Sequence, residues 1–295
     1  MTINPAIAIA ALLTLIPFLA AAFFAKAISG LAETRSTGVR LFGPAVLCVP
    51  YVLVACSSGI FRWSWFALYA LLPVAVAVLL WQAGRVDAER RGNWRDFLVL
   101  ATLGLAVDLR WFEHGWPAHL AVFNKMLLLD AGIYGFLALR RLDGVGFDLR
   151  LRWRDISVGL REWAFYVPIA VPLGLGLGFL HVHGAWPGWL RMAELPAAAV
   201  FTFLFVAVPE ELFFRGWLQN LLERRIGRYG ALAVTSALFG LSHFNKRAVH
   251  FNWRYVLLAA LAGIFYGRAW RVERRVGASA VTHALVDTVW GFWLR

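Results

Sequence analysis

The sequence predicts an all-α fold, a polytopic bundle of eight to ten transmembrane helices. First, 61% of the 295 residues are hydrophobic and only 16% are charged, whereas soluble domains carry roughly 25% charged residues. Second, several apolar runs approach the roughly 20 residues that a helix needs to cross a bilayer. Third, many of the 15 Trp, such as Trp63, Trp81 and Trp111, stand near the ends of these runs, as is typical of an interfacial aromatic belt.

The N-terminal half, residues 1–139, is predicted to consist of transmembrane helices. Three of its apolar runs have the length of a spanning helix: Pro5–Ala25, Leu41–Phe61 and Trp63–Gln82. Two more are shorter or interrupted by charged residues: Phe97–Val107 and Pro117–Leu139. A run of about 20 apolar residues is sufficient for one crossing, so this half supplies up to five helices.

An Arg-rich segment, residues 140–163, separates this half from the rest of the chain. We interpret it as a cytoplasmic loop or a surface-lying amphipathic segment. The C-terminal half, residues 164–295, is predicted to be a second transmembrane domain. Its apolar runs are Ala164–Val182, Leu195–Val208, Tyr229–His243, Tyr255–Tyr266 and Val276–Leu294.

The net charge of +12 fits membrane orientation better than nucleic-acid binding, and we expect no nucleic-acid partner. Most of the 29 Lys and Arg residues fall in alternate loops, which the positive-inside rule assigns to the cytoplasm. Those loops are 26–40, 85–96, 140–162, 215–228 and 268–275. Arg far outnumbers Lys, a bias typical of GC-rich bacterial genomes, so the expected location is a bacterial inner membrane.

Three clusters of ionisable residues interrupt the apolar runs after residue 200. They are the string PEELFFR from Pro209 to Arg215, FGLSH from Phe239 to His243, and HALVD from His283 to Asp287. Charged groups inside a membrane are costly and are functional candidates by default. A spacing of four residues puts Glu211 with Arg215, Phe239 with His243, and His283 with Asp287 on shared helix faces. Glu210 points about a quarter-turn away from that first pair.

The helical rise predicts that these groups meet at one depth. At 1.5 Å per residue, Glu210 lies roughly 21 Å from Arg224, and His243 lies roughly 22 Å from Arg228. His283 and Asp287 lie roughly 12 and 18 Å beyond the next basic loop. A carboxylate and an imidazole in a dry cavity can hold and deprotonate a water molecule. A second imidazole can stabilise an oxyanion, so the set is sufficient to hydrolyse a peptide bond.

The three clusters resemble the E-E-x-x-x-R, F-x-x-x-H and H-x-x-x-N/D motifs of the CPBP family, which comprises CAAX proteases, bacteriocin-processing proteins and Abi proteins. The resemblance covers about residues 199–294 and implies a glutamate-type intramembrane endopeptidase. It implies that Glu210 is the catalytic base and that His243 is its partner in holding water. It also implies that His283 and Asp287 serve the oxyanion, and that Glu211, Arg215 and Phe239 give structural support.

Asp287 departs from the Asn that the prenyl proteases of this family typically have. An ionised Asp cannot donate a hydrogen bond to an oxyanion, so Asp287 must be protonated or must orient His283 instead. The departure favours a substrate other than a prenylated protein. A myxosortase-like or exosortase-system-associated member is one such possibility, and leader peptides and bacteriocin precursors are others. The expected partners are therefore a membrane-associated protein or peptide substrate and the lipid bilayer.

Other interpretations of the same residues stay open. No cofactor is expected, but two His and one Glu could also bind Zn²⁺, which would give a metal-dependent version of the same protease. The buried Glu and His could instead form a proton relay or scaffold in a non-catalytic immunity factor or transporter. Taken singly, the Glu pair fits a helix end, and each His fits a packed core residue. The sequence carries no signal for the oligomeric state.

Overall fold

The computed structural model describes residues 4–182, 188–246 and 250–294 and confirms the all-α prediction. Within these residues every regular element is a helix. Five segments are long and apolar enough to cross a membrane, so the protein is a multi-pass membrane protein. These segments are Pro5–Glu33, Thr37–Ser57, Trp63–Val86, Ala118–Leu139 and Arg191–Leu241. Each of the ten predicted apolar runs falls largely on helix.

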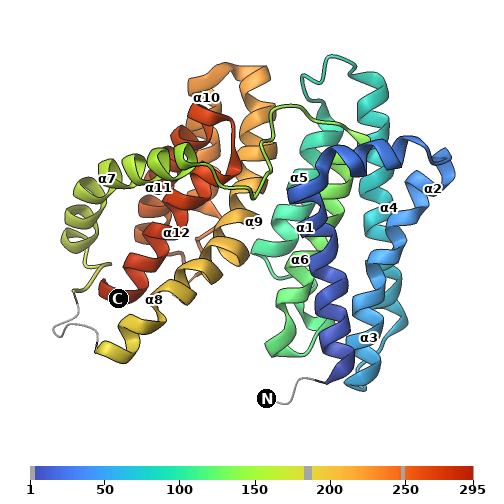
Figure 1. The fold of residues 1–295 in the computed structure, drawn as a ribbon, viewed down its shortest axis with the longest axis horizontal. Coiled ribbons are helices and arrows are strands. Elements are labelled where there is room, and N and C mark those ends of the chain that lie inside the picture. Colours follow the sequence, from blue (N-terminus) through green and yellow to red (C-terminus); the bar gives the residue numbers. More distant parts are fainter. Residues whose placement is uncertain (1–3, 183–187, 247–249, 295) are drawn as a thin grey trace. The chain divides into compact units, whose positions relative to one another are not determined.

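The chain forms two compact units, Met1–Asp143 and Gly144–Arg295 (Figure 1). The boundary lies inside the Arg-rich segment 140–163. This segment is not a single element, because residues 141–152 contain no helix and residues 153–163 form the start of the 24-residue helix α7.

Residues 4–143, the described part of the first unit, contain six α-helices and four short 3-10 or π elements. The α-helices are α1 (Pro5–Glu33), α2 (Thr37–Phe42), α3 (Val49–Ser57), α4 (Trp63–Val86), α5 (Trp94–Asp108) and α6 (Val122–Ile133). The short elements are η1 (Gly43–Cys48), η2 (Glu113–Gly115), η3 (Ala118–Leu120) and the π-helix η4 (Tyr134–Leu139). The expected loop 26–40 is wrong over most of its length, because α1 continues to Glu33 and α2 begins at Thr37.

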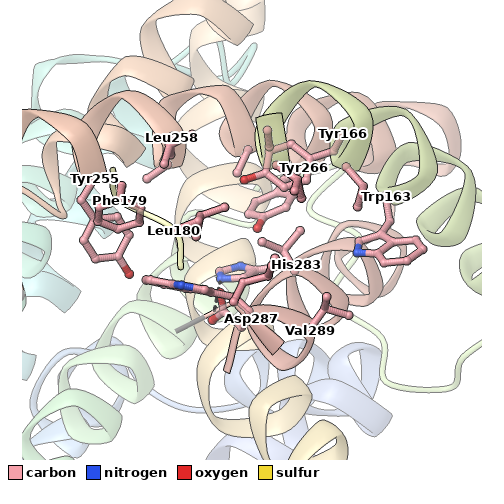
Figure 2. A pocket seen from close by; sticks show the side chains of 18 of the residues that line it. Trp163, Tyr166, Phe179, Leu180, Tyr255, Leu258, Tyr266, His283, Asp287 and Val289 are labelled. Atoms are coloured by element: carbon pink, nitrogen blue, oxygen red, sulfur yellow. Dashed lines mark ion pairs between the residues drawn. The ribbon is translucent and has the colours of Figure 1, made fainter. Parts of the chain in front are cut away.

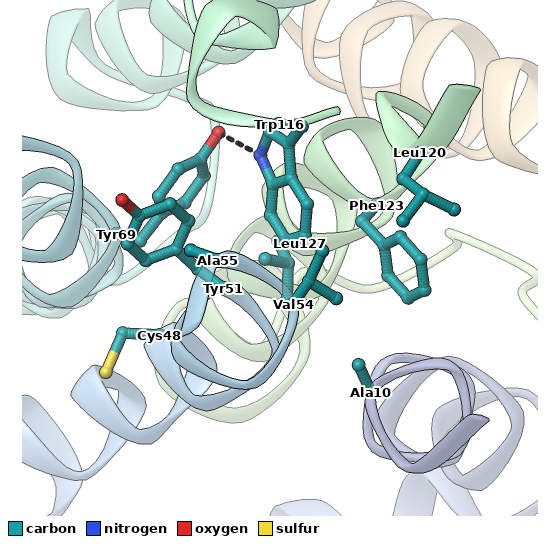
Figure 3. Close-up of a cluster of buried hydrophobic side chains, with 10 residues drawn as sticks. All are labelled: Ala10, Cys48, Tyr51, Val54, Ala55, Tyr69, Trp116, Leu120, Phe123 and Leu127. Atoms are coloured by element: carbon teal, nitrogen blue, oxygen red, sulfur yellow. Dashed lines mark hydrogen bonds between the residues drawn. The ribbon is translucent and has the colours of Figure 1, made fainter. Parts of the chain in front are cut away.

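Aromatic side chains form the centre of the first unit (Figure 3). The ring of Tyr51 stacks on that of Tyr69 at a centroid distance of 5.2 Å, and Trp116 stacks on Phe123 at 5.4 Å. The hydroxyl of Tyr69 accepts a 2.7 Å hydrogen bond from Trp116 Nε1 and lies 2.8 Å from Asn124 Oδ1. The tyrosine hydroxyl thus pairs the buried Trp116 Nε1 with the buried Asn124 Oδ1.

The described residues of the second unit form five longer α-helices, and two π-helical stretches lie between the second and the third of them. The α-helices are α7 (Trp153–Gly176), α8 (Trp189–Thr202), α10 (Asn220–Leu241), α11 (Trp253–Glu273) and α12 (Val276–Trp293). Between α8 and α10 lie the π-helix η5 (Phe203–Ala207), the short α9 (Val208–Glu211) and the π-helix η6 (Leu212–Gln219). Wide π turns interrupt α-helices most often at functional sites.

The predicted cytoplasmic loop 215–228 is wrong, because helix continues through most of it. Arg215 lies within η6 and is fully buried, and α10 starts at Asn220. The chain turns at Gly227, whose φ of 75° is a backbone conformation that glycine adopts without strain. Glu223 explains why the helix persists next to a basic string: its carboxylate pairs with Arg271 at 2.9 Å and with Arg274 at 2.6 Å.

A Trp-Arg-Asp string begins one helix in each unit, and in each case its Asp is fully buried. Asp96 of α5 accepts a 2.8 Å hydrogen bond from Arg140 Nε. Asp155 of α7 accepts a 2.9 Å bond from Arg275 Nε. Each carboxylate also accepts the backbone N–H three residues before it. This arrangement satisfies a buried charge through a helix N-terminus and a buried Arg.

Candidate active site

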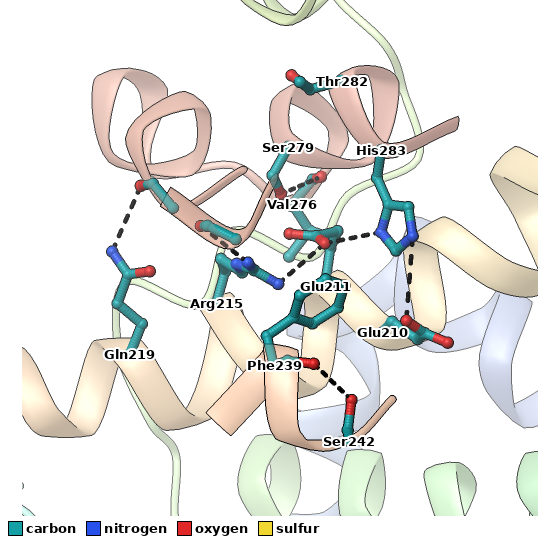
Figure 4. Close-up of polar contacts among 12 residues, drawn as sticks. Glu210, Glu211, Arg215, Gln219, Phe239, Ser242, Val276, Ser279, Thr282 and His283 are labelled. Atoms are coloured by element: carbon teal, nitrogen blue, oxygen red, sulfur yellow. Dashed lines mark hydrogen bonds and ion pairs between the residues drawn. The ribbon is translucent and has the colours of Figure 1, made fainter. Parts of the chain in front are cut away.

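The candidate site lies in the second unit, where α9, η6, α10, α11 and α12 converge. Glu210 and Glu211 end α9, and Arg215 follows one turn later in η6. Phe239 belongs to the last turn of α10, and His283 lies midway along α12. Figure 4 shows these side chains pointing toward one another from their separate helices.

Glu211 and Arg215 form the buried base of the site. Arg215 Nη1 donates to Glu211 Oε1 at 3.0 Å, and both side chains are fully buried. Arg215 Nη2 also donates to the carbonyl oxygen of Gly263 in α11 at 3.0 Å. The guanidinium carbon lies 4.6 Å from the ring centre of Phe239, within cation–π range. The four-residue spacing in the sequence predicts this ion pair, and the structure contains it.

His283 is the central group of the site. Its Nδ1 lies 2.9 Å from Glu211 Oε1, and because a carboxylate paired with Arg215 accepts only, Nδ1 carries the proton. Its Nε2 lies 4.0 Å from Glu210 Oε2 and 3.5 Å from Asp287 Oδ2. The side chains of Glu210 and Asp287 are about one third exposed, whereas His283 is buried. Two partly exposed carboxylates therefore flank Nε2, the second nitrogen of one buried imidazole.

His243 follows directly after α10 and faces the same region across Phe239. Its Nδ1 lies 2.9 Å from the Phe239 carbonyl oxygen and 3.1 Å from Ser242 Oγ. A carbonyl oxygen only accepts, so Nδ1 carries the proton and the neutral ring presents Nε2 as an acceptor. The ring of Phe239 lies 5.0 Å from that of His243 and 5.6 Å from that of His283. The ring of Phe239 thus contacts both imidazoles.

A cavity of about 70 Å³ opens beside the two histidines (Figure 2). His243, His283 and Asp287 supply part of its wall, and most of the remainder is apolar or aromatic. The aromatic lining consists of Trp163, Tyr166, Phe179, Phe239, Tyr255, Tyr266 and Trp290. A water needs about 10–15 Å³ measured in this way, so the cavity holds several waters or a small part of a ligand.

The structure brings together all seven residues that the sequence singles out. Glu210, Glu211, Asp287 and His283 meet within hydrogen-bonding or near-contact distance, Arg215 joins them through Glu211, and Phe239 links them to His243. Sequence reasoning missed two features. One is the hydrogen bond from His283 to Glu211, the residue assigned only a structural role. The other is Tyr266, whose ring stacks on that of His283 at 4.6 Å and 14°.

The zinc alternative finds no supporting geometry in the described part of the chain. Among residues 4–182, 188–246 and 250–294, no group of three or more His, Cys, Asp or Glu side chains is arranged to hold a metal ion. We therefore derive no chemical step through a metal.

Comparison with known proteins gives one match. Residues 192–289 match the family described as Type II CAAX prenyl endopeptidase Rce1-like. This segment runs from α8 to α12 and holds every candidate site residue, so it confirms the resemblance to CAAX proteases drawn from the three motifs. The chain matches no curated protein and no solved structure.

Proposed function

We propose that this chain, whose residues 192–289 match the Rce1-like CAAX endopeptidases, is an intramembrane protease that cleaves a peptide bond through an activated water. The family implies a protease in general terms, and the reaction proposed here goes further. One observation carries it: Glu210 Oε2 and His283 Nε2 lie 4.0 Å apart, and Glu211 holds the other nitrogen of His283.

The gap between these two atoms fits a bridging oxygen. It is too long for a direct hydrogen bond, and an oxygen atom about 2.8 Å from both atoms would span it. In the proposed reaction a water oxygen fills this gap before the substrate binds, and the scissile carbonyl oxygen then takes the place beside His283 Nε2 while the water stays with Glu210. Glu210 takes a proton from the water as the water oxygen attacks the scissile carbonyl carbon from the opposite face. Nε2 of His243, which is an acceptor, helps to hold the same water.

His283 takes the opposite role. With Nδ1–H donated to Glu211, protonation of Nε2 makes His283 a donor toward the carbonyl oxygen as that oxygen becomes an oxyanion. Two carboxylates beside Nε2 favour the imidazolium form over the neutral ring. Collapse of the tetrahedral intermediate then moves the proton from Glu210 to the departing amine nitrogen, which balances the hydrolysis without a covalent intermediate.

The substrate is proposed to be a membrane-associated protein or peptide that reaches the site in or beside the bilayer of a bacterial inner membrane. Two probes cover the main classes. The first is a quenched-fluorescent farnesylated peptide ending in a CAAX sequence. The second is an unprenylated peptide with a short apolar C-terminal helix, which represents sorting tails.

The test is cleavage of these probes by the full chain reconstituted in proteoliposomes, with product termini identified by mass spectrometry. We expect the wild type to cleave at least one probe at one bond, and we expect Glu210→Gln to abolish that cleavage. If Glu210→Gln cleaves as fast as the wild type, or if it keeps full biological function in cells, a non-catalytic membrane protein is the better description.

A further inference from the structure

Two carboxylates converge on the nitrogen of His283 that must face an oxyanion. Asp287 Oδ2 lies 3.5 Å from Nε2 and Glu210 Oε2 lies 4.0 Å from it. A carboxylate accepts hydrogen bonds and donates none. An amide at position 287 would supply a donor here, but the Asp of this chain supplies a further negative charge when ionised. A developing oxyanion at this place therefore needs a donor from another residue.

Tyr266 lies in the position to provide it. Its ring stacks on His283 at a centroid distance of 4.6 Å, and its side chain lines the cavity. The ring of Tyr266 also contacts the ring of Phe239 at a centroid distance of 5.6 Å, so packing fixes the orientation of the Tyr266 ring. A fixed donor costs little reorganisation when charge develops, which is the property that oxyanion stabilisation requires.

The hydroxyl group of Tyr266 is available for this purpose. Within the described part of the chain it has no hydrogen-bond partner, and the side chain of Tyr266 lines the cavity although only 1% of the residue is exposed. Buried tyrosine hydroxyls ordinarily find a partner, as Tyr69 does in the first unit. Asp287 and Tyr266 line the same cavity. Figure 2 shows Tyr266, His283 and Asp287 among the side chains that line the cavity.

We propose that the Tyr266 hydroxyl donates a hydrogen bond to the oxyanion and so replaces the donor that Asp287 lacks. No proton leaves Tyr266 in this step. The carbonyl oxygen gains negative charge as the water oxygen bonds to carbon, and the O–H of Tyr266 and the Nε2–H of His283 stabilise that charge until the C–N bond breaks. This inference rests on the proposed function, because it assigns a catalytic residue to the same reaction.

The test uses Tyr266→Phe, which keeps the ring on His283 and removes only the hydroxyl. On a probe that the wild type cleaves, we expect kcat to fall about 10²–10³-fold, with KM changed less than about threefold. The matched control is Tyr229→Phe, because Tyr229 lies exposed on α10 and its hydroxyl does not reach the cavity. Thermal unfolding of both variants checks that neither change disturbs the fold.

A second substitution separates donation from packing. In the Tyr266→Phe background, Asp287→Asn supplies an amide donor four residues after His283, and we expect it to restore kcat at least about tenfold over Tyr266→Phe alone. Unchanged kcat in Tyr266→Phe overturns the inference, and so does a loss that Asp287→Asn fails to restore. In either of those cases the proposed function stands if Glu210→Gln is inactive. Failure of the wild type to cleave either probe overturns both proposals together.

Discussion

Replacing Glu211 tests whether its carboxylate both balances a buried charge and holds His283. The change Glu211→Gln keeps the side-chain shape and leaves the fully buried Arg215 without its ion-pair partner. Removing one member of a buried pair typically costs about 3–5 kcal/mol. For a unit of this size, each kcal/mol lowers the unfolding temperature by about 2–4 °C, so we expect a decrease of roughly 6–20 °C. The neighbouring change Glu210→Gln is the matched control, since Glu210 is partly exposed and should leave the unfolding temperature within about 2 °C of wild type.

The double variant Glu211→Leu with Arg215→Met distinguishes the two roles of Glu211. Removing both charges takes away the unpaired guanidinium, so stability should return to within about 1–2 kcal/mol of wild type. Activity should stay roughly 10²-fold low, because His283 has lost the acceptor on Nδ1 that orients it. Thermal unfolding in detergent and probe cleavage in proteoliposomes measure the two effects. Wild-type stability of Glu211→Gln, or recovery of activity in the double variant, would refute this reasoning.

Three further predictions follow from other parts of the molecule. Partial burial raises the pKa of the Asp148 carboxyl, but hydrogen bonds from the Arg150 backbone N–H and from Arg275 outweigh it and lower that pKa below 3.8. The stability that this carboxylate contributes is therefore present above about pH 4 and is lost as the pH falls further. Below pH 4 the unfolding temperature of Asp148→Asn should therefore depend less on pH than that of the wild type. An equally steep dependence would contradict this. Gly146→Ala should destabilise the protein by about 2–4 kcal/mol, because φ is +70° and an added Cβ would lie 1.9 Å from the Arg274 carbonyl oxygen; an unchanged unfolding temperature would be evidence against that contact. Probe cleavage should survive exhaustive chelation, whereas a loss that added Zn²⁺ reverses would identify the metal-dependent alternative.

The membrane fold could be predicted from the sequence because it depends mainly on the length of apolar runs along the chain. An apolar run of sufficient length forms a helix in a bilayer whatever its neighbours do, since its backbone groups have no other partners there. The prediction of a loop at 215–228 rested on its basic residues, and those same residues led to the error. Arg224 and Arg225 indicate an interface, but Glu223 finds basic partners on α11 and its C-terminal cap, 48 and 51 residues further along the chain, and the helix continues to the turn at Gly227.

The candidate site was predicted in composition but not in its connections. Spacings of four residues report contacts along one helix, which is why the Glu211–Arg215 pair was accessible. The contact between Glu211 and His283 joins residues 72 apart, and no local periodicity encodes it. The π-helix η6 is also invisible to a 3.6-residue pattern. The sequence gives one weak indication of a role for Tyr266, because it is a hydroxyl-bearing residue at the end of an apolar run. Aromatic residues at such positions usually lie at the membrane interface.

A repeated string also escaped notice in the sequence. Trp94-Arg95-Asp96 and Trp153-Arg154-Asp155 are only three residues long, too short to stand out by similarity alone. The two strings have the same structural role: in each, the Asp binds a buried Arg, which is 44 residues away in one unit and 120 in the other. Long-range pairing of this kind depends on the folded arrangement of helices.

The most direct test of the central claim is an experimental structure of the Glu210→Gln variant with an uncleaved probe peptide bound. We expect a scissile carbonyl whose oxygen lies within about 3 Å of His283 Nε2 and of the Tyr266 hydroxyl. We also expect a water on the opposite face of that carbonyl, held by the residue-210 side chain and His243. A peptide bound away from His283, or a carbonyl oxygen directed toward lipid instead of these two donors, would contradict the central claim.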